Sequence, residues 1–204
     1  MKDCFAILGQ PRRPWLDADA VRTTFMSRAA DSHPDRFHQA PSPDQAAAHQ
    51  QYTALNDAQH CLTDTRTRLR HFLELERGGR VTDLQEIPED LMELFSQLAA
   101  QLRATDRFLE TWNAASSPLL KANLFNEGET HRAAIQALMA SIREKARVVE
   151  NSVREVDSAW GESGPADAVT RDHLLTQLES LYRITSFQDR WTQQLQSRAT
   201  DLLP

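Results

Sequence analysis

The sequence predicts an all-α protein. Apolar residues recur at the three- and four-residue spacing of amphipathic helices along the 204 residues, whereas the two-residue alternation of strands is nowhere sustained. Only six residues are glycine and two are tyrosine. With 40% apolar residues the chain can build a packed core, either as one domain of ordinary size or as two small ones.

Two helices are expected at the start of the chain. The short apolar segment Phe5–Leu8 is followed by Gly9, a residue type that commonly ends helices. Asp17 is a suitable N-cap for the second helix. That helix ends before Pro34, because the residue preceding a proline avoids the α region. Its apolar face consists of Val21, Phe25 and Ala29.

A third and a fourth helix follow a polar loop. Ser42 is placed to cap the third helix, with Pro43 as its first residue. A fourth, basic helix starts near Arg66 and ends at the glycines Gly78 and Gly79. The apolar stripes of these two helices are Ala48, Tyr52, Leu55, Ala58 and Leu62, and then Leu69, Phe72 and Leu73.

The second half of the chain predicts three long helices. Pro88 is well placed as the first helical residue, and Glu89 and Asp90 interact favourably with the helix dipole. Gly161–Pro165 forms a turn before the last helix. Long amphipathic helices joined by short turns indicate an antiparallel bundle.

Residues 78–86 are the predicted linker, because they begin with the glycine pair and show little regular pattern. We therefore expect an N-terminal domain at residues 1–77 and a C-terminal three-helix domain at residues 87–204.

Composition argues against several classes of protein. The net charge is −6 and no long basic run occurs, which argues against nucleic acid as a partner. Apolar runs are only a few residues long, so we expect no membrane span, and the N-terminus lacks the apolar stretch of a secretory signal. These features predict a cytoplasmic protein.

Cys4 and Cys61 are too few for a disulfide framework. No CxxC pair occurs, which argues against a zinc site of the usual kind. We expect both cysteines to be small, buried apolar groups, and we expect the chain to hold no metal or other cofactor.

The tripeptide His33-Pro34-Asp35 lies between two helices that are expected to pair antiparallel. In this respect the chain resembles the J-domain family. Members of that family have, in chain order, a short helix, a long helix, an HPD loop, a second long helix and a second short helix, and residues 3–76 contain a counterpart of each. The resemblance implies a non-enzymatic co-chaperone whose HPD loop and second helix dock on a DnaK-class chaperone and promote ATP hydrolysis there. Pro34 restricts the loop, Asp35 can pair with an arginine, and His33 presents two distinct nitrogens.

Two other interpretations of this loop remain. The tripeptide can be a helix-ending turn without further function, since proline in such turns is common. A metal site is also conceivable, because His33, Asp35 and His38 are potential ligands close in sequence. Against that site, Pro34 stiffens the loop and no fourth ligand follows at a recognisable spacing.

The resemblance implies that basic residues of the second helix face the chaperone. The candidates are Arg22 and Arg28, with Arg36 directly after the motif. Three aspartates in or beside this helix oppose them, so electrostatic steering is expected to be weak. Asp31 and Ser32 also stand where the family commonly has basic and aromatic residues.

The whole chain resembles the HscB family, the J-domain co-chaperones of iron–sulfur cluster assembly. A three-helix domain follows the J-domain, without the Gly/Phe-rich linker or zinc repeats of a general DnaJ. The matching segments are Phe5…Leu8-Gly9, Leu16-Asp17, Leu55-Asn56-Asp57-Ala58, Arg68…Phe72-Leu73, Leu91-Met92-Glu93 and Phe187-Gln188-Asp189-Arg190.

This resemblance implies that Leu91, Met92, Phe95 and Phe187 bind the scaffold client, an IscU-type protein. Helical geometry gives an independent reason to consider them. Met92 lies about 100° from the centre of its helix's apolar stripe, Phe95 near its edge, and Phe187 roughly 90° from the stripe of the last helix. Exposed large apolar side chains commonly mark binding surfaces. The alternative is that they widen the core or pack between the domains.

The sequence therefore predicts a co-chaperone that stimulates a DnaK- or HscA-class ATPase and delivers an iron–sulfur scaffold protein to it. One alternative is a specialised J-protein for another client. The other is a helical adaptor whose J-like domain no longer activates an ATPase.

Overall fold

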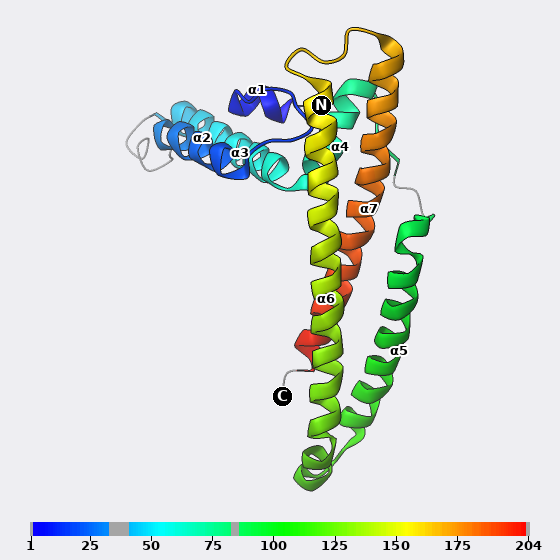
Figure 1. Cartoon of the computed structure of the whole chain (residues 1–204). Coiled ribbons are helices and arrows are strands. Elements are labelled where there is room, and N and C mark those ends of the chain that lie inside the picture. Colours follow the sequence, from blue (N-terminus) through cyan, green and yellow to red (C-terminus); the bar gives the residue numbers. More distant parts are fainter. Residues whose placement is uncertain (1, 33–40, 83–85, 203–204) are drawn as a thin grey trace. The chain divides into compact units, whose positions relative to one another are not determined.

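The computed structural model describes residues 2–32, 41–82 and 86–202, and this part of the chain contains helices and no strands (Figure 1). The predicted all-α fold is confirmed. The α-helices of the described residues are α1 (Cys4–Leu8), α2 (Ala18–Asp31), α3 (Ser42–Thr63), α4 (Thr65–Arg77), α5 (Met92–Ala114), α6 (Pro118–Trp160) and α7 (Ala168–Asp201), and a 3-10 helix, η2 (Glu89–Leu91), precedes α5.

Several helix ends follow the predicted local chemistry. The Asp17 side chain accepts a hydrogen bond from the backbone N–H of Asp19, so the predicted N-cap of α2 is confirmed. Gly9 ends α1 with φ 60° and Gly78 ends α4 with φ 68°, both in the left-handed region that favours glycine. The predicted Ser42 cap is wrong. Ser42 is already helical, and Pro41 precedes it without a side-chain cap.

The chain forms two compact units. The first contains Met1–Thr82 together with Glu150–Tyr182, and the second contains Asp83–Val149 together with Arg183–Pro204. Both α6 and α7 therefore contribute to each unit. The predicted domains at residues 1–77 and 87–204, with a linker at 78–86, are continuous segments of the chain, whereas each of these units contains two segments. The predicted domain boundaries stay a prediction.

An aromatic cluster joins distant segments within the first unit. The Phe72 ring of α4 lies 6.4 Å from Phe5 and 5.1 Å from Trp160, with edge-to-face geometry in both pairs. All three side chains are buried. This is a favourable arrangement for aromatic rings, and it packs the end of α6 against α1 and α4.

Polar contacts reinforce the same packing. The Arg13 guanidinium donates from Nε to Asp157 Oδ1 at 3.0 Å and from Nη2 to Oδ2 at 2.6 Å. These hydrogen bonds raise the pKa of Arg13. Trp15 donates its indole N–H to Glu150 at 2.7 Å. The loop between α1 and α2 is thereby fixed to α6 through charge-assisted hydrogen bonds, which are stronger than neutral ones.

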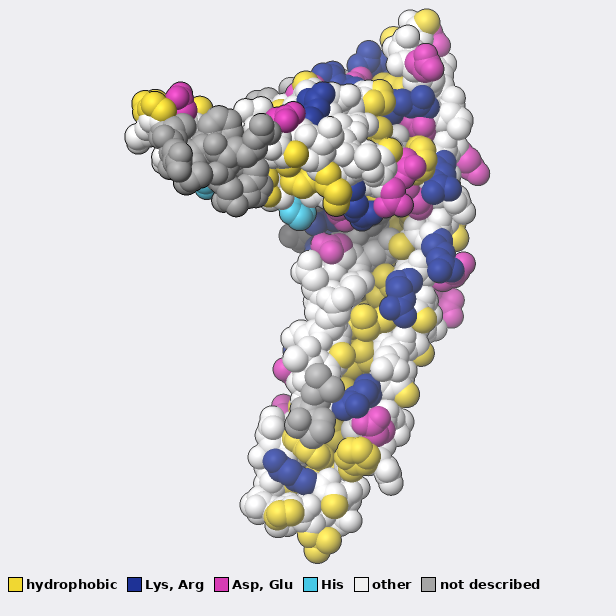
Figure 2. Space-filling view, turned by 90° about the vertical axis from the view of Figure 1, so that its left-hand side faces the viewer, with side chains coloured by type: hydrophobic (Ala, Val, Ile, Leu, Met, Phe, Trp, Pro, Cys, Tyr) yellow, Lys and Arg dark blue, Asp and Glu magenta, His cyan; other side chains and the backbone are white. Residues whose placement is uncertain are grey.

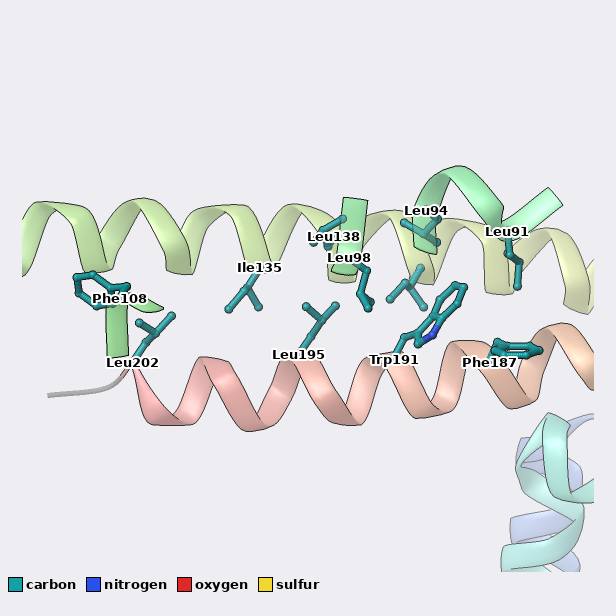
Figure 3. Packing of buried hydrophobic residues seen from close by; sticks show 11 residues of the cluster. Leu91, Leu94, Leu98, Phe108, Ile135, Leu138, Phe187, Trp191, Leu195 and Leu202 are labelled. Atoms are coloured by element: carbon teal, nitrogen blue, oxygen red, sulfur yellow. The ribbon is translucent and has the colours of Figure 1, made fainter. Parts of the chain in front are cut away.

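The core of the second unit is a three-helix packing of α5, the first part of α6 and the end of α7 (Figure 3). Its buried members are Leu91, Leu94, Leu98, Phe108, Ile135, Leu138, Ile142, Phe187, Trp191, Leu195 and Leu202. The predicted bundle of three amphipathic helices is present in this unit. None of the helices described combines the length and apolar character that a membrane span requires.

Candidate functional site

The predicted chaperone-binding loop falls outside the described residues. This applies to His33, Pro34, Asp35 and Arg36, and also to His38 of the alternative metal site. The helices on either side are described. α2 and α3 pack together as predicted, with the Phe25 and Tyr52 rings 6.3 Å apart (Figure 1).

The two predicted chaperone-facing cations of α2 have partners within the chain. Arg22 donates to Asp19 one turn earlier at 2.7 Å, and both side chains are exposed. Arg28 donates to the backbone carbonyl of Ile7 at 2.9 Å. Its guanidinium covers the end of α1, where a Cβ on Gly9 would clash with Arg28 Nη2. Exposed pairs of this kind are weak, so Arg22 can exchange Asp19 for an external partner. Arg28 also holds α1 against α2.

Ser32, directly before the predicted motif, is only 3% exposed. Its hydroxyl lies 3.4 Å from the carbonyl oxygen of Arg28, to which it donates. The Ser32 side chain is therefore shielded within the chain.

The four candidate client-binding residues differ in exposure. Met92 is 50% exposed, as predicted for a binding residue. Phe95 is half-buried and stacks on Trp191, with ring centroids 6.0 Å apart. Leu91 is buried, and Phe187 is 6% exposed, so the expectation that Phe187 stands off the core is wrong.

The burial of Phe187 has a clear structural basis. Its ring lies 5.7 Å from Trp191, and the Arg190 guanidinium covers it at 4.4 Å from the ring centroid. Figure 3 places Leu91 and Phe187 toward the same end of the core cluster. The structure thus brings Leu91, Phe95 and Phe187 into one cluster. Of the four candidates, Met92 presents the most accessible apolar side chain.

Charged side chains are mixed on the face that Figure 2 shows. Lys and Arg are scattered among Asp and Glu over the described atoms of this face. This distribution agrees with the weak steering expected from the sequence of α2.

No protein-family model matches the chain. Among solved structures, the chaperone HscB from Vibrio cholerae superposes with a TM-score of 0.58 at 18% sequence identity, covering 99% of this chain and 100% of that one. The chain shares its fold with HscB. The superposition covers nearly the whole of both chains, so it includes both the N-terminal helices and the helical bundle.

One further cluster was missed by the sequence analysis. Cys4, Cys61 and His71 come from three helices of the first unit, and their ligand atoms lie within 4.8 Å of one another. Both cysteines are half-buried, whereas the sequence predicted fully buried apolar groups. No spacing signal marked the cluster, because Cys4 is far from the other two residues in the sequence and Cys61 and His71 lie on different helices.

Proposed function

We propose that the protein is a non-enzymatic, cytoplasmic co-chaperone that stimulates the ATPase of a DnaK- or HscA-class chaperone. It delivers an iron–sulfur scaffold protein of the IscU type to that chaperone. The observation that carries the proposal is the His33-Pro34-Asp35 sequence between paired helices α2 and α3, in a chain that shares the HscB fold over its whole length.

The charges around α2 bear on how binding occurs. Arg22 and Arg28 each have an intrachain partner, so long-range attraction contributes little to the encounter. Binding then depends mainly on the loop, where Asp35 offers a carboxylate to an arginine of the chaperone.

A single-turnover ATPase assay tests the proposal. A DnaK- or HscA-class chaperone preloaded with ATP is mixed with the full chain, with and without an IscU-type scaffold protein. We expect faster hydrolysis with the chain alone and a further increase when the scaffold is present. An unchanged rate with both chaperones and the scaffold would refute the proposal.

Truncating Met92 should weaken scaffold binding without loss of stability. For Met92→Ala we expect an affinity lower by about tenfold, the effect of losing one interface anchor. The melting temperature should hardly change, because truncation of a half-exposed side chain removes little packing. Calorimetry with the scaffold, and a thermal melt of each protein, measure the two quantities.

Met26→Ala is the matched control for this variant. Met26 is an exposed methionine on α2, in the other compact unit, and its truncation should leave scaffold affinity unchanged. Equal affinity of the Met92 variant and the parent chain would remove Met92 from the client site.

Two alternatives each have an observation in their favour. The burial of Leu91 and Phe187 removes two of the four predicted client-binding side chains from the surface, which favours a specialised J-protein with another client. The intrachain partners of Arg22 and Arg28 favour an adaptor that no longer activates an ATPase. Scaffold that does not bind, together with stimulated hydrolysis, indicates the first. Bound scaffold without stimulation indicates the second.

A further inference from the structure

Cys4, Cys61 and His71 form a compact group of metal-ligating side chains in the first unit. Cys4 is the first residue of α1, Cys61 lies near the end of α3, and His71 lies in the middle of α4. One ligand atom of each lies within 4.8 Å of those of the other two. His71 is buried and the two cysteines are half-buried, so the group is shielded from solvent but accessible to a small ion.

The backbone and neighbouring rings hold these residues in place. The backbone N–H of Cys4 donates to His71 Nε2 at 3.0 Å, and the imidazole stacks on Phe5 with ring centroids 5.7 Å apart. The lone pair of Nε2 accepts this hydrogen bond, and the same lone pair is the one that would bind a metal. Thr67 donates its hydroxyl to the Cys61 carbonyl at 2.8 Å and fixes the turn between α3 and α4.

The donor atoms select one class of ion. Two sulfurs and one imidazole nitrogen suit thiophilic ions such as Zn²⁺, whereas Ca²⁺ and Mg²⁺ take oxygen ligands. A tetrahedral zinc ion places its ligand atoms about 3.4–3.8 Å apart, so the group must contract by up to about 1.4 Å. His71 must also exchange its hydrogen bond from Cys4 for the metal bond.

We propose that Cys4, Cys61 and His71 bind one zinc ion, with a fourth position left for water or an external ligand. Three protein ligands of this kind are a known zinc set. Asp3, whose Oδ1 lies 4.0 Å from His71 Nε2, adds negative charge beside the site.

Metal titration of the reduced full-length chain tests this assignment. Co²⁺ serves as the optical probe, because thiolate ligands give it a charge-transfer absorption. Zn²⁺ should then displace it. We expect one ion per chain, and weaker binding by at least about 100-fold in Cys4→Ser and in Cys61→Ser, since outer-shell partners alone account for 10- to 100-fold. Zn²⁺ should raise the melting temperature of the parent chain but not of these variants.

His60→Gln is the matched control. His60 is the neighbour of Cys61 on α3 and lies outside the group, so this variant should bind zinc like the parent chain. The cysteine variants carry the test because serine is nearly isosteric, and melts without metal establish that they fold. Two results would overturn the proposal. One is that the reduced chain shows no thiolate–cobalt band while the same chain forms a Cys4–Cys61 disulfide in air, which would mean that the two thiols pair with each other and do not bind a metal. The other is unchanged zinc affinity in both cysteine variants.

Discussion

A chain carrying His33→Gln should lose its stimulation of the chaperone ATPase, with a rate enhancement lower by roughly tenfold or more. In the proposed complex His33 belongs to the loop that contacts the ATPase domain, and losing a central interface residue costs this much or more in affinity. The single-turnover hydrolysis rate at several concentrations of the variant measures the loss. Circular dichroism should show an unchanged helix content.

His38→Gln provides a control within the same segment between α2 and α3. It makes the same chemical change five residues further on and should retain stimulation. The pair of variants also tests the alternative metal site, in which both histidines are ligands and both changes should be equally harmful. Normal stimulation by His33→Gln would mean that the tripeptide is a turn without a chaperone role.

Arg68→Ala should destabilise the first unit by about 3–5 kcal/mol, the usual cost of breaking a buried charged network. The Arg68 side chain is 1% exposed. Its guanidinium donates to the backbone carbonyls of Pro14 and Leu62, both at 3.0 Å, and to the Thr65 hydroxyl at 3.3 Å. Burial lowers the pKa of Arg68, and the negative charge of Glu150, 3.7 Å away, opposes that effect.

Alanine would leave the two buried carbonyls of Pro14 and Leu62 without their donor and would open a cavity. For a chain of this length the expected fall in melting temperature is roughly 6–20 °C. Arg70→Ala is the control, because Arg70 lies on the same helix with an exposed side chain that pairs with Glu74 at 3.2 Å. Its loss should cost about 1 kcal/mol or less. Similar melting temperatures for the two variants would contradict the structural role of Arg68.

Local patterns in the sequence predicted the helices well. Asp17 and Gly78 mark helix ends through short-range hydrogen bonds and backbone conformation, both of which are properties of neighbouring residues. The periodic apolar stripes predicted the helices of both units. The prediction was wrong for Phe187, because four consecutive residues of α7, 185–188, are buried. A helical wheel assumes that one face is buried and the opposite face is exposed, and this assumption fails where a segment is buried on all sides.

Long-range contacts had no signal in the sequence. Arg13 and Asp157 are separated by 144 residues, and neither lies in a motif that would mark the pair. Phe72 and Trp160 are also far apart in the sequence, at a separation of 88 residues. The sequence of the linker at residues 78–86 therefore did not indicate that α6 and α7 contribute to the first unit. The group of Cys4, Cys61 and His71 was missed for the same reason, because tertiary packing brings its members together.

The composition of the first unit also affects how the chain folds during synthesis. The helices α1 to α4 are synthesised before their partners at residues 150–182, and Trp160 follows Phe72 by 88 residues. At synthesis rates of roughly 5–20 residues per second, the buried Phe72 side chain of α4 waits about 4–18 s for Trp160. During that interval the nascent chain would itself expose the kind of apolar surface that general chaperones bind.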